Sequence, residues 1–304
     1  MRLAFAGTPE FAIPTLKKLL RSHTVCLVIT QPDRPKGRGK IVEPPPVKIE
    51  AINNHIPVTQ PDTLRDGKIH NLLKAHNLDA VVVVAYGKMI PEDMLYIPRH
   101  GFINVHASLL PLYRGASPIN RAIMDGHKAS GVSIMLIDKG MDSGPVYLKA
   151  EIPIEDNDDA ITLAKKLSIL GAEKILEVLT LIGKGEIQPK PQDHAMATYA
   201  PMLKKPEGSI NWDQNPIIIN NMIRGLVPWP CVLVHVNAIP LKIWKASYTI
   251  QEHELKPGTL IKEKGGIKIA CRGGYIVLEK VQPAGKKIMD ALAFAQGLRE
   301  ILLR

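Results

Sequence analysis

The sequence predicts an α/β protein in which a Rossmann-like doubly wound parallel sheet is followed by a small β-barrel domain. At 304 residues the chain is longer than a typical domain of ~150 residues, which favours two domains. Strand-like and helix-like segments alternate through residues 1–189, as expected for parallel strands joined by right-handed crossovers. From residue 207 onwards short strand-like segments follow one another, which is typical of a small barrel.

Hydrophobic periodicity predicts each element of the first domain. Leu3–Ala6 is a short apolar run, and Thr8 and Pro9 suit the start of the helix that follows. Continuous apolar runs such as residues 80–85 (AVVVVA) indicate strands that are covered on both faces. The expected strands are 3–6, 25–29, 80–85, 102–105 and 132–137, with further helices at 69–76, 118–124 and 161–182.

Glycine and proline interrupt this alternation between residues 183 and 207. We therefore expect a first domain over 1–189, a linker over 190–206 and a second domain over 207–304. Five evenly spaced strands in the second domain predict a small closed barrel. These strands are expected at 232–236, 241–244, 258–261, 267–270 and 275–278.

The charge balance points to a polyanionic partner. The formal net charge is +10, and residues 205–304 alone hold 14 Lys and Arg against 8 Asp and Glu. Charge does not distinguish a nucleic acid from a phosphorylated metabolite or an anionic membrane. No apolar stretch approaches the ~20 residues of a membrane span. Three widely separated cysteines offer no disulfide framework and no paired metal ligands, so we expect a cytoplasmic protein.

The turn after the first strand does not suit a dinucleotide. Residues 7–11 (GTPEF) contain one glycine where a nicotinamide or flavin site needs Gly-x-Gly-x-x-Gly, and Glu10 would repel a phosphate. We expect no nicotinamide cofactor. The sequence also has no His-Glu-x-x-His or Cys-x-x-Cys spacing, so we expect no metal.

The strongest candidate site lies at the end of the strand expected at 102–105. Asn104 and His106 are two residues apart, so their side chains project from the same face. Ligands of open α/β sheets bind at the carboxyl ends of the strands, where an amide and an imidazole can stabilise an oxyanion and move a proton. The alternative is a polar strand end that holds a loop, and spacing alone does not decide between the two.

A third group lies in the loop Gly140–Gly144, just past the strand expected at 132–137. Asp142 stands between two glycines, which indicate a tight loop. Its carboxylate is placed either to hold the His106 imidazole in one tautomer or to cap its own backbone, as Asp beside Gly commonly does. Composition does not decide here either.

The segment Gln31–Lys48 is rich in Pro and Gly and carries a net charge of +3. It is either a basic arm that reaches phosphates or a solvated surface loop. The basic second domain favours the arm, and with it a nucleic-acid partner.

Several motifs resemble those of the folate-dependent formyltransferases: Phe5–Pro9, Asn104–Pro111, Tyr113–Ala116 and Met141–Gly144. A second set is similar to the branch of that family that acts on methionyl initiator tRNA: Thr30–Pro35, Pro228–Pro230, Trp244–Ala246 and Gln282–Lys287. The resemblance covers essentially the whole chain.

This resemblance implies a Rossmann-like catalytic domain and a C-terminal OB-like tRNA-binding domain. It also implies an enzyme that transfers the formyl group of 10-formyltetrahydrofolate to the α-amino group of methionyl initiator tRNA, without metal or nicotinamide. We expect a monomer, because tRNA binding needs both domains exposed. The resemblance implies that the catalytic residues are Asn104, His106 and Asp142. It implies that folate binds to Ser108, Leu109, Leu110 and Pro111. It also implies that the tRNA is bound by the loop residues Arg34, Lys36, Arg38 and Lys40, and it places Phe11 near the methionyl side chain.

Other branches of the family share the three catalytic residues. Glycinamide ribonucleotide transformylase is normally a single domain, so the expected barrel argues against it. Amino-sugar formyltransferases and the hydrolase domain of formyltetrahydrofolate dehydrogenase do have a second domain. The basic segment Asp33–Lys48 argues against these two. An RNA-binding protein on an inactive enzyme scaffold is a further alternative, which the intact motifs disfavour.

Overall fold

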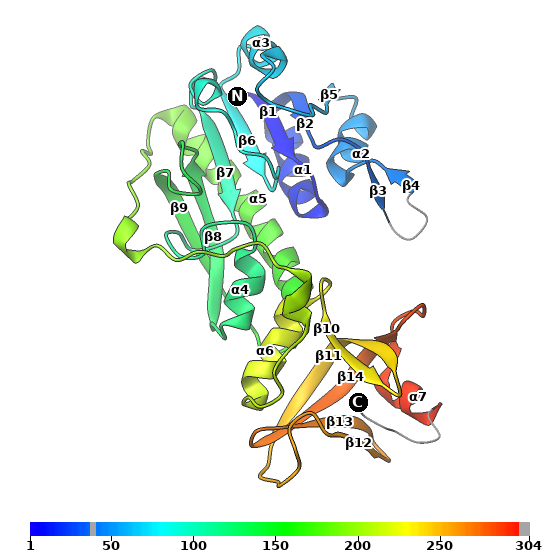
Figure 1. The fold of residues 1–304 in the computed structure, drawn as a ribbon. Coiled ribbons are helices and arrows are strands. Elements are labelled where there is room, and N and C mark those ends of the chain that lie inside the picture. Colours follow the sequence, from blue (N-terminus) through cyan, green and yellow to red (C-terminus); the bar gives the residue numbers. More distant parts are fainter. Residues whose placement is uncertain (37–40, 298–304) are drawn as a thin grey trace. The chain divides into compact units, whose positions relative to one another are not determined.

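The computed structural model describes residues 1–36 and 41–297. The chain forms two compact units (Figure 1). The first consists of residues 1–115, 130–152 and 164–199, and the second of residues 116–129, 153–163 and 200–304. Two short segments that precede residue 200 in the sequence, 116–129 and 153–163, therefore belong to the second unit.

A seven-stranded sheet forms the centre of the first unit, with the strand order β5-β2-β1-β6-β7-β8-β9. The strands from β5 to β7 are parallel, and β8 is antiparallel to β7. The strands are β1 (Arg2–Gly7), β2 (Thr24–Ile29), β5 (Val58–Thr59), β6 (Ala80–Val84), β7 (Phe102–His106), β8 (Ala129–Leu136) and β9 (Val146–Pro153). The predicted Rossmann-like class is confirmed.

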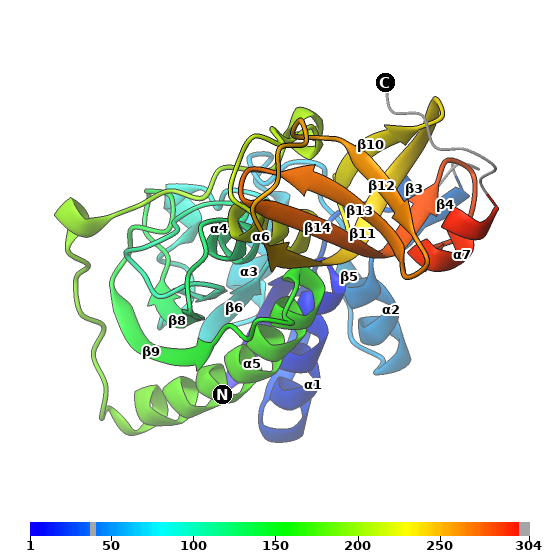
Figure 2. The ribbon, with the colours of Figure 1, turned by 90° about the horizontal axis from the view of Figure 1, so that it is seen from below.

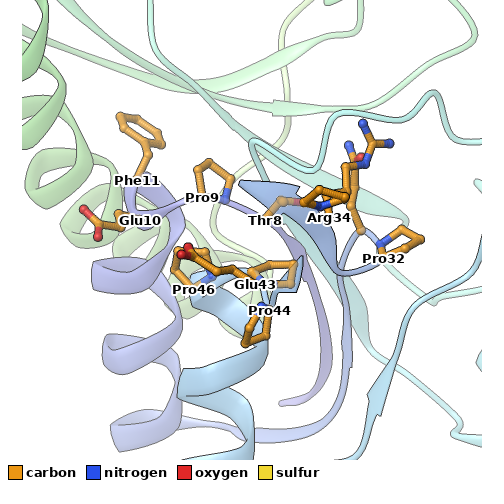
Figure 3. A pocket seen from close by; sticks show the side chains of 12 residues that line it. Thr8, Pro9, Glu10, Phe11, Pro32, Arg34, Glu43, Pro44 and Pro46 are labelled. Carbon is orange, nitrogen blue, oxygen red and sulfur yellow. The ribbon is translucent and has the colours of Figure 1, made fainter. Parts of the chain in front are cut away.

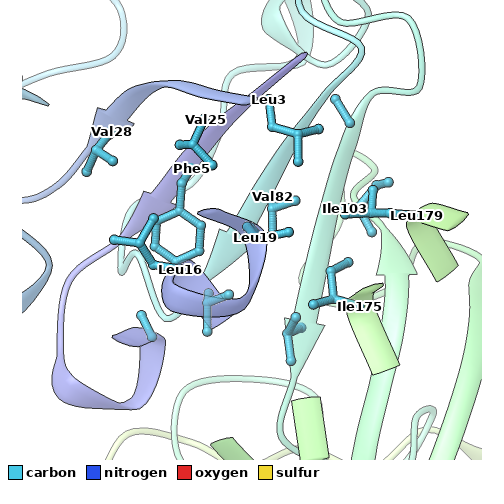
Figure 4. Packing of buried hydrophobic residues seen from close by; sticks show 14 of the residues in the cluster. Leu3, Phe5, Leu16, Leu19, Val25, Val28, Val82, Ile103, Ile175 and Leu179 are labelled. Atoms are coloured by element: carbon cyan, nitrogen blue, oxygen red, sulfur yellow. The ribbon is translucent and has the colours of Figure 1, made fainter. Parts of the chain in front are cut away.

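Helices cover both faces of this sheet, as its apolar strands require. On one face Leu16 and Leu19 of α1 (Ile13–Ser22) lie beside Phe5 of β1, and Ile175 and Leu179 of α5 (Ala160–Lys184) lie beside Ile103 of β7 (Figure 4). Figure 2 shows α1 and α5 side by side.

On the opposite face the apolar side of α3 (Lys68–Ala75) packs on residues of β1, β2, β6 and β7. Each strand therefore sends alternate side chains to the two faces. Ile103 and Val105 of β7 face α1 and α5, whereas Phe102 faces α3.

The expectation of an all-parallel sheet was wrong for β8, which is antiparallel to β7. The helix between β7 and β8 is α4 (Pro118–Met124), which belongs to the second unit and does not cross the sheet. Without a crossover the chain re-enters beside β7 in the opposite direction. A short loop then leads to β9, which the sequence analysis did not predict and which forms one edge of the sheet.

The second unit is built on an antiparallel sheet with the order β10-β11-β14-β13-β12, and β15 pairs with β14. Its strands are β10 (Val232–Val236), β11 (Ile239–Ile250), β12 (Leu260–Glu263), β13 (Gly266–Cys271), β14 (Gly274–Pro283) and β15 (Met289–Asp290). Residues of α6 (Pro216–Leu226) and α7 (Ala291–Gln296) share its apolar core.

The expected closure of this barrel is not seen in the described part of the chain. There β10 pairs only with β11, and β12 only with β13, so the sheet is curled but open. The register of β11 against β14 shifts twice near Lys245, and such irregularities bend a strand. Ile219 and Ile223 of α6 fill the concave core instead of a closing strand pair.

The basic segment is more regular than the loop that the sequence predicts. It contains a two-stranded hairpin of β3 (Arg34–Lys36) and β4 (Ile41–Glu43), and α2 (Pro46–Asn53) begins before the expected end of the loop. Over the described residues, no helix combines the length and apolar character that a membrane crossing requires.

Candidate active site

β7 brings the first two candidate residues together. Asn104 and His106 share the face of Phe102, because Ile103 and Val105 between them point into the core under α1 and α5. The Asn104 side chain is half-buried, and it makes no hydrogen bond to any other residue within 1–36 and 41–297. Its amide group is therefore available to a ligand.

His106 lies between two acceptor groups. The residue is only 6% exposed. Its Nε2 lies 3.0 Å from the carbonyl oxygen of Tyr113, and its Nδ1 lies 3.6 Å from Oδ2 of Asp142. Each ring nitrogen of His106 therefore faces an acceptor oxygen, the Tyr113 carbonyl on one side and the Asp142 carboxylate on the other.

The structure places Asp142 against His106, not over its own backbone. Besides its contact with Nδ1, Oδ2 of Asp142 accepts a hydrogen bond of 2.8 Å from the backbone N–H of Gly115. The backbone-capping role in this loop belongs to Asp138, whose Oδ1 accepts from the Gly140 N–H at 3.0 Å and the Ser143 hydroxyl at 2.8 Å. Asp138 lies outside every motif identified in the sequence.

A close approach of two backbones shapes the same loop. A Cβ atom at Gly144 would lie 1.9 Å from the carbonyl oxygen of Leu136, so only glycine fits. Asp142 itself has a φ of 49°, in the left-handed region that residues other than glycine rarely adopt. The loop is thus folded tightly onto the end of β8.

Ser133 of β8 organises the segment Ser108–Pro111. Its hydroxyl donates to the Ser108 carbonyl at 2.7 Å and accepts from the Leu110 N–H at 3.0 Å. Ser108 and Leu110 are buried, while Leu109 and Pro111 are half-buried. A ligand would therefore contact this segment through Leu109, Pro111 and the main chain. The sequence analysis did not identify Ser133, which it placed inside a strand.

Gln192 and Arg114 join the Asp142 loop to the linker segment. Gln192 donates to the carbonyl oxygens of Asp142 and Gly144 at 2.9 and 2.7 Å. Its Oε1 accepts from Nε and Nη2 of Arg114 at 3.2 and 2.8 Å. Nη2 of Arg114 also lies 3.0 Å from Nδ1 of His194. Arg114 belongs to the motif Tyr113–Ala116, which supports the family resemblance. Gln192 belongs to no motif and lies in the segment predicted as a linker, 190–206.

A hollow of about 520 Å³ lies beside the turn after β1 (Figure 3). Phe11 and several prolines line it, together with Arg34 of β3 and the carboxylates Glu10 and Glu43. This places Phe11 and Arg34 in one hollow.

The walls of this hollow are tied to Tyr86. The Thr8 hydroxyl and Nε2 of Gln31 donate to the Tyr86 carbonyl oxygen at 3.0 and 2.9 Å. Burial raises the pKa of the Tyr86 phenol to about 12, so it is neutral at physiological pH.

The remaining basic-loop residues are only partly described. Arg34 is exposed on β3, Lys36 ends β3, and Arg38 and Lys40 lie outside the described residues. At the base of the hairpin the Asp33 carboxylate accepts from Nε2 of Gln60 and Nζ of Lys48, each at 2.6 Å. The hydrogen bond from Gln60, followed by that from Lys48, lowers the pKa of Asp33. No three His, Cys, Asp or Glu side chains of the described chain form a metal-binding group.

Comparisons with known proteins show the family of the chain. Residues 1–179 match the formyl transferase family, and residues 202–299 match the formyl transferase C-terminal domain. The chain is 46% identical over 296 residues to the methionyl-tRNA formyltransferase of Thermodesulfovibrio yellowstonii, covering 97% of this chain and 95% of that protein. The chain belongs to the methionyl-tRNA formyltransferase family. A second member, from Geotalea uraniireducens, is 44% identical over 98% of this chain and 96% of its own length.

Solved structures show the same fold at lower identity. The N-formyltransferase of Helicobacter canadensis, solved with folinic acid and dTDP-3-aminofucose, has a TM-score of 0.70 at 21% identity, covering 92% of this chain and 98% of its own. Glycinamide ribonucleotide transformylase 1 of Symbiobacterium toebii has a TM-score of 0.53 at 18% identity, covering 94% of its own chain but only 64% of this one. That structure therefore lacks a counterpart to about a third of this chain.

Proposed function

We propose that the chain transfers the formyl group of 10-formyltetrahydrofolate to the α-amino group of methionyl initiator tRNA. The observation that carries this proposal is the convergence of Asn104, His106 and Asp142 at the carboxyl end of β7. It occurs in a chain that is similar to methionyl-tRNA formyltransferases over nearly its full length. The folate is a cosubstrate, and the reaction needs neither a metal nor a nicotinamide.

The reaction is an acyl transfer. The unprotonated α-amine attacks the formyl carbon and forms the new C–N bond, and the bond from that carbon to N10 of the folate then breaks. The amine loses one proton and N10 gains one, which leaves tetrahydrofolate. A model α-amino group has a pKa of ~7.7–8.0, so a useful fraction of the nucleophile is uncharged at neutral pH.

Each residue of the trio has a role in this sequence of bonds. The Asn104 amide, which has no protein partner in the described chain, donates to the oxyanion of the tetrahedral intermediate. The His106 imidazole lies two residues further along the same strand face and assists the oxyanion or the proton transfer. Asp142 fixes the imidazole from its Nδ1 side.

The folate site extends from the trio over the segment Ser108–Pro111. Leu109, Pro111 and the main chain form its accessible part. Structures of the same fold hold folate derivatives, namely folinic acid in the Helicobacter canadensis protein and tetrahydrofolic acid in HypX of Aquifex aeolicus. This supports a folate in this chain too.

The tRNA would meet the basic hairpin and the basic second domain. Arg34, Lys36, Arg38 and Lys40 contact phosphates of the acceptor stem, and Phe11 in the prolyl-lined hollow receives the methionyl side chain. In this assignment residues 1–189 are the catalytic domain, 190–206 the linker and 207–304 the tRNA-binding domain of a cytoplasmic monomer.

The test is a formyl-transfer assay with 10-formyltetrahydrofolate and methionyl initiator tRNA, comparing wild type with His106→Ala. We expect rapid transfer by the wild type and a collapse of kcat in the variant while folate binding persists. Release of tetrahydrofolate with water or an amino sugar as the acceptor, and none with the charged tRNA, would refute the assigned acceptor and leave the folate site standing.

A further inference from the structure

A single glutamine uses every polar atom of its side chain at the edge of the candidate site. Gln192 is only 8% exposed. Its Nε2 donates both hydrogens, to the carbonyl oxygens of Asp142 and Gly144, while its Oε1 accepts two hydrogen bonds from Arg114. A buried amide with all of these contacts fixes the groups around it, because breaking any one leaves a buried polar group unpaired.

The groups that Gln192 holds are those on either side of the Asp142 carboxylate. The Asp142 backbone has a φ of 49°, and residues other than glycine keep such a conformation only where surrounding contacts impose it. The two carbonyl oxygens that Gln192 binds belong to Asp142 itself and to the residue two positions later. They span the strained turn.

Arg114 strengthens this arrangement from the other side. Arg114 is only 4% exposed, and its guanidinium donates to Oε1 of Gln192, which polarises the amide and makes its N–H groups better donors. The neighbouring Gly115 N–H binds Oδ2 of Asp142, and the Tyr113 carbonyl oxygen binds His106. Residues 113–115 and Gln192 thus hold both His106 and Asp142.

We propose that Gln192 is a positioning residue, which sets the Asp142 carboxylate against His106 through its hydrogen bonds to the Asp142 loop. This inference rests on the proposed function, in which Asp142 acts on His106. Gln192 binds backbone carbonyl oxygens and not the carboxylate oxygens of Asp142, so it acts on the carboxylate through the backbone of the loop.

Gln192→Glu separates positioning from simple anchoring of the linker. The variant has nearly the same shape and still accepts from Arg114, with an added ion pair, so the linker stays attached. It places a carboxylate oxygen against two carbonyl oxygens, where the wild type places N–H donors. Asp193→Ala is the matched control: within the described residues the Asp193 side chain only accepts a hydrogen bond of 3.0 Å from the Ala195 N–H in the adjacent turn.

The measurement is a double-mutant cycle on formyl transfer, with Gln192→Glu in the wild type and in Asp142→Asn. We expect Gln192→Glu to lower kcat about tenfold, the lower end of the effect of removing a group that orients a functional side chain. The KM values for both substrates should change less than about twofold, and Asp193→Ala should match the wild type. In the Asp142→Asn background the same change should cost less than about twofold, because the carboxylate to be oriented is already gone.

Equal losses in both backgrounds would show that Gln192 acts only on general structure and would overturn the proposal. Wild-type kcat in Gln192→Glu would overturn it as well. The wild type shows separately whether the proposed function fails. If it does not formylate the tRNA, the double-mutant cycle is repeated with hydrolytic release of the formyl group as the measured reaction.

Amide hydrogen exchange gives a readout that needs no activity. Peptides covering residues 139–146 should exchange faster in Gln192→Glu than in the wild type, and Asp193→Ala should leave them unchanged. Unchanged protection of this segment in Gln192→Glu would contradict the proposal, whatever the acceptor of the formyl group.

Discussion

The Asp142 loop (137–145) and the basic hairpin (β3 and β4) are held in opposite ways. The Asp142 loop receives hydrogen bonds from Gly115 and Gln192, which lie in two distant segments of the chain, and those contacts are buried or half-buried. At the base of the hairpin Lys48 and Gln60 bind Asp33, which is half-exposed.

This difference matches two tasks. Stabilising an oxyanion needs groups fixed in advance, because reorganisation at the moment of reaction is costly. Binding the phosphates of a large substrate needs positive charge at a distance from the sheet. The strength of this binding depends on the salt concentration more than on fixed geometry. Changes in the first region should therefore act on kcat, and changes in the second on substrate binding.

The largest expected effect belongs to Asn104→Ala. Removing one donor from a preorganised oxyanion site typically costs ~10²–10³ in kcat, and the Asn104 side chain makes no hydrogen bond within the described chain that the change would break. Steady-state formyl transfer measures the loss, and folate binding by fluorescence is the control. A variant that keeps near wild-type kcat would remove Asn104 from the oxyanion role.

Asp142→Asn should have a smaller effect on the same parameter. The amide oxygen still accepts from the Gly115 N–H, so the loop keeps its shape, but no negative charge faces His106. We expect kcat to fall about 10²-fold, at the low end of what positioned proton-transfer groups contribute. Asp138→Asn is the comparison, because in the described part of the chain Asp138 makes its side-chain hydrogen bonds within its own loop. A larger loss in Asp138→Asn than in Asp142→Asn would reverse the assignment.

Deleting residues 35–40 should act on tRNA alone. The deletion removes Lys36, Arg38 and Lys40. Each lost phosphate contact lowers the slope of log affinity against log salt by ~0.7–0.9, so the slope for charged tRNA should fall by about 2 while folate affinity is unchanged. Binding measured from low to high salt gives this slope. An unchanged slope would mean that these residues form only a solvated loop.

The smallest effect should come from Asp33→Asn at the base of the hairpin. Hydrogen bonds from Gln60 and Lys48 lower the pKa of Asp33 in the folded protein. A lowered folded-state pKa stabilises the fold above the unfolded pKa of ~3.9, and this contribution is lost as the pH falls through the folded value.

Thermal unfolding of the wild type and Asp33→Asn checks this sign. The wild type should have the higher Tm at pH 7, and the difference should shrink towards acidic pH. A difference that grows as the pH falls would contradict the role given to this carboxylate.

Local patterns in the sequence predicted most of the first sheet. Buried apolar runs such as β6, and the two-residue spacing of Asn104 and His106 on β7, depend only on neighbours along the chain. The direction of β8 was not predictable in the same way. It depends on α4 leaving the sheet for the second unit, which is a matter of long-range packing.

The candidate site shows the same limit. The sequence left Asp142 between two roles, because the choice depends on Gly115, 27 residues away, and on Gln192, 50 residues away. Hydrogen bonds of this range leave no periodicity and no motif in the sequence. The role of Ser133 was missed for the same reason, since its hydroxyl binds backbone groups of Ser108 and Leu110, 25 and 23 residues away. Asp138 binds groups only two and five residues away, but several aspartates and glycines in this loop could share that local role.

The edge strand β9 has a consequence for solubility. A free sheet edge invites strands of other copies to add to it, which leads to aggregation. Here Lys190 pairs with the first residue of β9, Val146, and the exposed positions that follow are Lys149, Glu151 and Pro153. Charged side chains and a proline on an edge strand oppose such addition. Replacing Lys149 and Glu151 with valine should therefore increase self-association of the protein.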